Sequence, residues 1–183
     1  YPLRQMEVGI LVTGTEVFTG LIEDKFAPVI SQKVAEYGCT VMDMKFAPDN
    51  RERIYKAVQE LREDGAELIV TTAGLSVDPD DVTRKALEDA GLHNYLYGIP
   101  ILPGAMSLVG EFKASKEQGE LEKCAVIGVP ACALFHKITA FDVLLPLVLA
   151  GVPLDREIFA RRAAGGLCES CETCTYPHCR FAV

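Results

Sequence analysis

The stretch "AELIVTTAGLSVDPDDVTRKALEDAG" (66–91) decides the fold class, because it contains a complete strand–loop–helix unit. Its opening, "AELIVTT" (66–72), is a short apolar run typical of a buried strand. The segment 80–90 has helical character and ends at Gly91. Two similar units precede it, and this alternation predicts a parallel sheet covered by helices on both faces.

The two earlier units follow the same logic. β-Branched or alternating runs predict the strands, and apolar residues at helical spacing predict the helices. Asp49 or Asn50 is a suitable N-cap for the second helix, which Gly65 ends. The elements expected in chain order are strand 7–12, helix 24–37, strand 39–47 and helix 50–64.

The pattern changes after Gly91. Residues 93–120 contain two prolines and four glycines, so we expect an irregular meander or short strands there. "KCAVIGVP" (123–130) predicts a further strand and turn, and 133–151 a mostly buried helix that Pro146 should kink or shorten. The sheet is therefore expected to be mixed, although mostly parallel.

Composition narrows the class of protein. With 183 residues, 49% of them hydrophobic, the chain suits one α/β domain over 1–164 followed by a Cys-rich tail over 165–183. A net charge of -8 without basic blocks argues against nucleic-acid binding. The most apolar stretch, 143–152, is too short for a membrane span, and the N-terminus lacks a secretory signal. We expect a cytoplasmic protein, and the start at Tyr1 is consistent with a segment of a longer polypeptide.

The loops after the strands are where a ligand is expected, because open α/β sheets bind ligands beyond the carboxyl ends of their strands. These loops hold small residues, which let a ligand approach the backbone, and they lead into helices whose free N–H groups favour phosphate. The third loop also holds Asp78, Asp80 and Asp81. Carboxylates repel phosphate unless a divalent cation lies between them, so the pattern predicts Mg²⁺.

A purely structural interpretation exists for these acids. Asp80 or Asp81 could cap the third helix, and Asp78 could make the turn with Pro79. Further acids on neighbouring loops, Asp49 and Glu16, favour a site, because acids that converge at strand ends are what a site requires.

Four motifs on these loops carry a family resemblance. They are Gly14-Thr15-Glu16, Asp49 in "PDNRERI", "AGLSVDPDDVT" (73–83) with Asp81-Val82-Thr83, and Gly128-Val129-Pro130. In this order, over about residues 7 to 150, the chain resembles the molybdopterin-binding domain family. That family includes molybdopterin adenylyltransferases and molybdenum insertases.

The resemblance implies a three-layer α/β/α fold, a homo-oligomer that is commonly a trimer, and a role in the synthesis or handling of molybdenum cofactor. It places Asp49 and Asp81 near the pterin and its metal ion, as the candidate catalytic residues. If the domain is an enzyme, the reaction would be adenylyl transfer or molybdate insertion by electrostatic positioning. The residues expected to bind the pterin or its phosphate are Thr13, Gly14, Thr15, Glu16, Thr72, Gly74, Leu75, Ser76, Thr83, Gly128 and Pro130.

Three positions depart from the family pattern. Thr15 replaces an acid, Ala73 replaces a glycine, and Ala131-Cys132 follows Pro130 where insertases commonly have Pro-Gly-Asn-Pro. These departures favour binding over turnover, so a non-catalytic carrier or sensor of the cofactor is one alternative. The other is a nucleotide pyrophosphatase acting on ADP-ribose-type ligands, because "GLSVDPDD" and "DNRERI" also resemble competence-damage-inducible protein A.

The tail segment "CESCETCTYPHC" (168–179) has the spacing C-x2-C-x2-C-x4-C. This is close to an iron–sulfur pattern, and tetrahedral zinc suits the same thiols. Disulfides or disordered thiols are the alternatives. The metal-ligand candidates are Cys168, Cys171, Cys174 and Cys179, whereas His178 is expected to be an exposed turn residue.

The other cysteines suggest ordinary packing. Cys39 and Cys124 open apolar strands and are expected to be core thiols. Cys132 near a helix start, with His136 one turn later, could form a reactive pair, but packing and capping roles are favoured.

Overall fold

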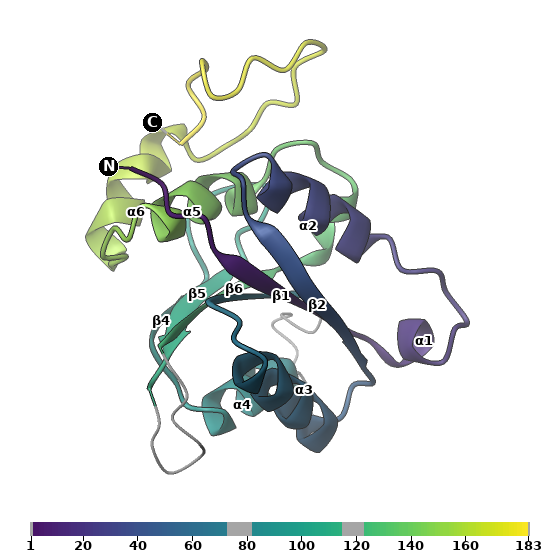
Figure 1. The fold of residues 1–183 in the computed structure, drawn as a ribbon. Helices are drawn as coiled ribbons and strands as arrows, with labels where there is room; N and C mark the ends of the chain where they lie inside the picture. The colour runs from purple at the N-terminus through teal and green to yellow at the C-terminus, as the bar shows by residue number, and fades with distance from the viewer. Residues whose placement is uncertain (1, 73–81, 115–122, 183) are drawn as a thin grey trace.

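The computed structural model describes residues 2–72, 82–114 and 123–182, and it contains a six-stranded sheet in the order β2-β1-β3-β6-β5-β4 (Figure 1). Strands β1, β2, β3 and β6 are mutually parallel, and β5 runs antiparallel to its neighbours β6 and β4. The sheet is therefore mixed and mostly parallel, as predicted. The strand bounds are β1 Glu7–Thr13, β2 Thr40–Ala47, β3 Leu68–Thr72, β4 Leu92–Tyr97, β5 Leu108–Phe112 and β6 Cys124–Val129.

Helices cover both faces of the sheet, so the expected three-layer α/β/α architecture is confirmed (Figure 1). One layer contains α2 (Phe26–Ala35), α5 (Ala140–Leu149) and α6 (Arg156–Arg162), and the other contains α3 (Arg51–Glu63) and α4 (Val82–Asp89). Short turns of helix connect these elements: α1 Thr15–Phe18, η1 Ala131–Leu134 and η2 Ala163–Gly165.

The central strand β1 shows how the sequence produces two cores. Val8, Ile10 and Val12 point into the core beneath α2 and α5, whereas Leu11 points into the core beneath α3 and α4. All four side chains are buried. Because successive side chains of a strand point to opposite faces, an uninterrupted apolar run is what a strand covered on both sides requires.

The late helix differs from the prediction of a helix over 133–151. The chain first forms η1, and α5 begins only at Ala140, where a capping box fixes its start: Thr139 and Asp142 exchange side-chain and backbone hydrogen bonds. The Asp142 carboxylate also pairs with Lys33 of α2. Capping signals of this kind override apolar periodicity in setting where a helix begins.

Pro146 lies inside α5 and does not end it. Proline lacks an N–H group, so the carbonyl oxygen of Asp142, four residues earlier, has no helical donor from that position. The hydroxyl of Tyr176, in the tail, donates a hydrogen bond to this oxygen at 2.9 Å. The tail thus replaces the backbone bond that the proline removes.

The meander expected after Gly91 contains the strands β4 and β5, and α6 follows Asp155, whose carboxylate accepts a hydrogen bond from the N–H of Ile158 at 2.8 Å. Sequence reasoning did not predict α6. None of the helices in the described residues is long and apolar enough to cross a membrane.

Candidate functional site

The carboxyl ends of four parallel strands meet at one edge of the sheet. The register aligns Thr13, at the end of β1, with Ala47, at the end of β2. On the other side, Thr72 at the end of β3 is paired with Val12 and with Val129. Helices α3 and α4 both begin at this edge, so their first N–H groups face it.

Thr15 and Asp49 join the first two loops of this edge by reciprocal hydrogen bonds. The Thr15 N–H and hydroxyl donate to Asp49 Oδ2, at 2.9 Å and 3.2 Å, and the same hydroxyl accepts from the Asp49 N–H at 3.2 Å. Both residues are exposed. Asn50, the next residue, caps α3 through its side chain, which accepts from the N–H of Arg53. The Asp49 carboxylate is therefore held in place while it stays accessible to a ligand.

Three threonines form a buried layer beneath this edge. The Thr13 hydroxyl donates to the carbonyl oxygen of Thr72 at 2.8 Å, and its oxygen lies 3.4 Å from the hydroxyl oxygen of Thr83. All three residues are at most 1% exposed. These contacts connect β1, β3 and α4, so Thr13 and Thr83 support the edge from below.

Two buried hydroxyls at the end of β3 are unusual. Those of Thr71 and Thr72 have no hydrogen-bond partner among residues 2–72, 82–114 and 123–182. A buried polar group without a partner costs free energy, and among the described residues Gln59, Arg62 and Ser107 also carry such atoms.

The Gly128-Val129-Pro130 motif is placed differently from the prediction. Gly128 and Val129 are the last residues of β6, where Gly128 is paired with Thr71 and buried. The turn begins at Pro130, which is half-buried and precedes η1. Only Pro130 of the three thus belongs to the loop beyond the strand, because the ladder with β3 extends to the end of β6.

Cys132 and His136 do not form a reactive pair, in agreement with the packing and capping roles that the sequence favoured. Burial raises the pKa of the Cys132 thiol, which opposes thiolate formation. Its sulfur lies 3.9 Å from the carbonyl oxygen of Pro130. The His136 side chain is exposed, and the hydrogen bond between the two residues joins their backbones.

The remaining predicted site residues divide into two groups. Gly14 lies between β1 and α1 and donates its N–H to the Ala47 carbonyl oxygen at 3.0 Å, and Glu16 is exposed in the first turn of α1. The others lie outside the described residues: Gly74, Leu75, Ser76 and Asp81, together with Asp78 and Asp80. In the described part of the chain, no group of three or more His, Cys, Asp or Glu side chains is arranged to hold a metal ion.

Sequence reasoning missed one feature beside Asp49. A small cavity of about 140 Å³ is lined by Ala47, Pro48 and Ala57, by the aromatic rings of Phe18 and Phe46, and by the charged side chains of Lys45, Arg53, Lys56 and Glu60. Arg53 stands in the first turn of α3, three residues after its cap, and that position was the available signal.

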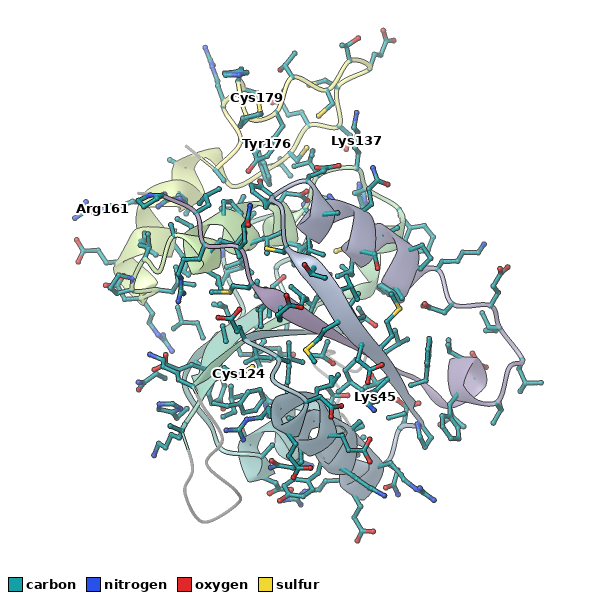
Figure 2. The ribbon with its side chains drawn as sticks, in the orientation of Figure 1. Lys45, Cys124, Lys137, Arg161, Tyr176 and Cys179 are labelled. Atoms are coloured by element: carbon teal, nitrogen blue, oxygen red, sulfur yellow. The ribbon has the colours of Figure 1, made fainter. Side chains whose placement is uncertain are left out.

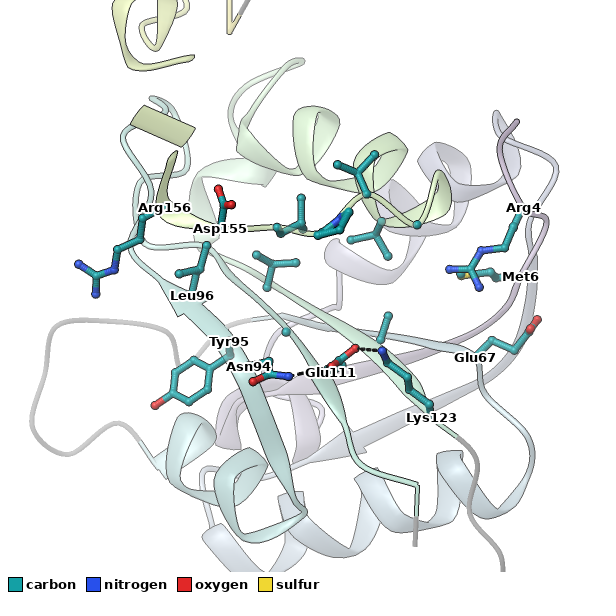
Figure 3. A pocket seen from close by; sticks show the side chains of 18 residues that line it. Arg4, Met6, Glu67, Asn94, Tyr95, Leu96, Glu111, Lys123, Asp155 and Arg156 are labelled. Carbon is teal, nitrogen blue, oxygen red and sulfur yellow. Dashed lines mark hydrogen bonds and ion pairs between the residues drawn. The ribbon is translucent and has the colours of Figure 1, made fainter. Parts of the chain in front are cut away.

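A larger cavity of about 940 Å³ lies at the opposite edge (Figure 3). Arg4, Glu67 and Lys123 border it, each just before a parallel strand, and Lys123 pairs with Glu111 of β5. This cavity is therefore formed at the amino ends of the strands, away from the loops that carry the motifs.

Comparison with known proteins identifies the family. The family model described as a probable molybdopterin binding domain matches residues 9–150. A molybdopterin molybdenumtransferase of Haemophilus influenzae is 28% identical over 152 residues, which are 79% of this chain and 35% of that protein. A CinA-like protein of Prochlorococcus marinus is 38% identical over 80 residues, 44% of this chain and 19% of that protein.

Solved structures show the same fold. The molybdopterin biosynthesis enzyme MoaB of Thermus thermophilus superposes with a TM-score of 0.61 at 19% identity, covering 82% of this chain and 100% of that one. The Mog protein of Mycobacterium ulcerans gives 0.56 at 18% identity, covering 78% and 91%. This chain spans about a third of the length of the molybdenumtransferases it matches. By the extent of the family match, the chain belongs to the molybdopterin-binding domain family.

Proposed function

We propose that this domain binds molybdopterin at the carboxyl edge of the sheet and serves the synthesis or handling of molybdenum cofactor. The observation that carries the proposal is the reciprocal Thr15–Asp49 pairing, which holds an exposed carboxylate beside the starts of α1 and α3. A fixed carboxylate suits the N–H donors of a pterin, and the first N–H groups of α3 suit its phosphate.

Mg²⁺ fits the groups that the structure describes. Both hydrogen bonds to the Asp49 carboxylate end on Oδ2, and Oδ1 has no hydrogen-bond partner among the described residues. An exposed carboxylate oxygen is a preferred ligand of this hard cation. Asp49 would hold the ion, together with Asp81 by family resemblance, and a bound ion would neutralise phosphate charge.

Any catalysis would depend on placement. Thr15 orients Asp49, and the Thr13–Thr83 contact fixes the start of α4 against β1. Such an arrangement suits phosphoryl or metal transfer, in which oriented charges stabilise the transition state without a covalent protein intermediate. The molybdenumtransferases among the relatives support molybdate insertion, and the alternative without turnover is a cofactor carrier.

A nucleotide pyrophosphatase is the second candidate. The observation in its favour is the similarity to a CinA-like protein, which is 38% identical over 80 residues, whereas the molybdenumtransferase is 28% identical over 152 residues. The same carboxylate would then hold Mg²⁺ beside the diphosphate of an ADP-ribose-type ligand.

The test is calorimetry with molybdopterin and, separately, with ADP-ribose, each with Mg²⁺ and each followed by a product assay with ATP or molybdate. We expect molybdopterin to bind to the parent and at least tenfold more weakly to Asp49→Asn. Asp64→Asn, which alters an exposed carboxylate at the other end of α3, is the matched control and should bind like the parent.

Each outcome has one meaning. Binding with product supports a transferase, and binding without product supports a carrier. Cleavage of ADP-ribose without pterin binding would establish the pyrophosphatase. Equal pterin affinity in Asp49→Asn and the parent would refute the proposed site.

A further inference from the structure

The C-terminal tail contains four cysteines in a loop whose two ends are held together by backbone hydrogen bonds. We propose that Cys168, Cys171, Cys174 and Cys179 together bind one thiolate-ligated metal centre, either a zinc ion or an iron–sulfur cluster. Four thiols within twelve residues, "CESCETCTYPHC", provide a complete ligand set for either centre. All four cysteines are free thiols.

The first support is that both ends of the loop are attached at the same place. Leu102 donates its N–H to the Gly166 carbonyl oxygen at 2.6 Å, and its own carbonyl oxygen accepts from the Cys168 N–H at 2.8 Å. At the other end, Ala182 donates its N–H to the Gly165 carbonyl oxygen at 2.8 Å. The chain between these contacts is a closed loop.

Glycines make this closure possible. A Cβ atom added to Gly165 would overlap the carbonyl oxygen of Arg180, and one added to Gly166 would overlap that of Pro100. The two ends of the loop can approach each other at Gly165, and the first end can approach the domain at Gly166, only because neither residue has a side chain.

The loop is also fastened near its middle. Tyr176 donates to the Asp142 carbonyl oxygen of α5, and its ring meets the ring of Phe181 edge-on, with centroids 6.1 Å apart. Phe181 is 6% exposed. In Figure 1 the loop lies beyond α2 and α5, on the side away from the sheet, and Figure 2 shows Tyr176 and Cys179 in this part of the molecule.

The four cysteines occupy two positions in this loop. Cys168 and Cys179 are half-buried near its base and pack against the core beneath α2 and α5. Cys171 and Cys174 are exposed on its outer arm. The closed base thus positions the first and last thiols, and the intervening arm carries the other two.

The outer arm, residues 169–175, contributes neither secondary structure nor buried side chains to the fold. Between Leu167 and Phe181 the chain forms neither helix nor strand, and most side chains of 169–175 are exposed. Irregular loops of this length are uncommon in compact domains unless they have a function. In the described residues the thiols are not gathered around one point, so metal binding requires Cys171 and Cys174 to move toward the base. Thiolate–metal bonds supply free energy for such ordering.

The test uses the full chain, expressed with iron and zinc supplied and purified without oxygen. We expect metal analysis to give about one zinc per chain, or about four iron and four sulfide with absorption of an iron–sulfur cluster. Removal by a chelator, followed by return of zinc alone or of iron with sulfide, distinguishes the two centres.

Variants make the assignment specific. Cys171→Ser and Cys174→Ser alter exposed thiols, so the fold should survive, as circular dichroism can confirm. Each should lose at least three quarters of the bound metal. Cys132→Ser, which alters a half-buried cysteine outside the tail, should keep it.

The proposal fails if the anaerobic parent binds no metal and takes up none on reconstitution. It also fails if both serine variants retain the parental content while folded. Pterin binding is measured separately, so either result leaves the candidate site at the sheet edge untouched.

Discussion

Tyr176 donates its hydroxyl hydrogen to the one Asp142 oxygen that Pro146 deprives of a helical donor. A residue of the Cys-rich tail therefore satisfies a backbone carbonyl of the α/β domain. This contact makes the tail part of the packing of α5.

The first prediction concerns this hydrogen bond. Tyr176→Phe removes the hydroxyl and leaves the Asp142 carbonyl oxygen without that donor, in a partly buried place. We expect the free energy of unfolding to fall by about 1 to 2 kcal/mol, as measured by urea denaturation.

Pro146→Ala provides the control for that experiment. Alanine restores a backbone N–H at position 146, which can donate to the same oxygen. Tyr176→Phe should therefore cost clearly less in the Pro146→Ala background than in the parent. Equal costs in both backgrounds would show that the hydroxyl does not replace the missing bond.

The second prediction concerns Thr15. Thr15→Val keeps the β-branched shape but removes the hydroxyl that bridges to the Asp49 carboxylate and N–H. Because the Thr15 N–H bond remains, we expect molybdopterin affinity to fall moderately, by about three- to tenfold, corresponding to roughly 1 kcal/mol. Calorimetry with Mg²⁺ measures this.

Thr40→Val is the matched control, because Thr40 is exposed at the start of β2, at the opposite edge. Unchanged affinity in both variants would mean that Thr15 does not orient Asp49 for binding.

The third prediction concerns Cys124. Burial raises the pKa of its thiol to about 12, from an ordinary value of 9.0. Above pH 9 the unfolded chain releases this proton while the folded chain keeps it, so stability falls as pH rises toward 12. The slope from this group is at most about 1.4 kcal/mol per pH unit.

Urea denaturation of the parent and of Cys124→Ala between pH 8.5 and 10.5 checks this, in buffers that keep thiols reduced. Burial also raises the pKa of Cys132 and Tyr37, so some alkaline loss should persist in the variant. Parallel curves for the two proteins would contradict the assignment to Cys124.

The fourth prediction concerns assembly. Phe18, Leu21 and Ile22 are 50%, 79% and 50% exposed. Phe18 is the last residue of α1, just after the loop that carries Thr15, and the other two follow it in the chain. Family resemblance predicts a homo-oligomer, and we expect these exposed apolar side chains to contribute to its interface. Leu21→Glu should shift the mass measured by light scattering toward the monomer.

Phe135→Glu tests whether any exposed apolar residue has this effect, because Phe135 is 80% exposed in the turn after η1. It should leave the mass unchanged. A parent that is monomeric at high micromolar concentration would refute the interface.

The sequence predicted those parts of the fold whose signals are local. The apolar run of β1 and the Asn50 cap of α3 are both observed. The helix expected over 133–151 is observed, but its predicted start was wrong, because an apolar run does not show that Thr139 and Asp142 start α5 only at Ala140. Pro146 was expected to disturb that helix, but its compensating partner is thirty residues away in sequence, beyond any local pattern.

In the candidate site too, features with a local sequence signal were predicted and features that depend on distant contacts were not. Strand ends and small residues predicted a site at the carboxyl edge of the sheet, and the structure places Asp49 at that edge. The sequence presented Thr15 as a pterin-binding candidate and as the loss of an acid, but its pairing with Asp49 could not be predicted, because it depends on how two distant loops meet. Gly128 was assigned to a turn, but strand pairing with β3 holds it inside the sheet.

The glycine pair at the base of the tail has a practical consequence for engineering. Gly165 contacts Arg180 at the other end of the loop, and Gly166 contacts Pro100 of the α/β domain, so replacing the exposed residues 169–175 should leave this attachment and the helices beneath unchanged. Tolerance to substitution should therefore be high in 169–175 and very low at Gly165 and Gly166. A foreign peptide inserted in place of 169–175 would be held at both ends by contacts that already exist.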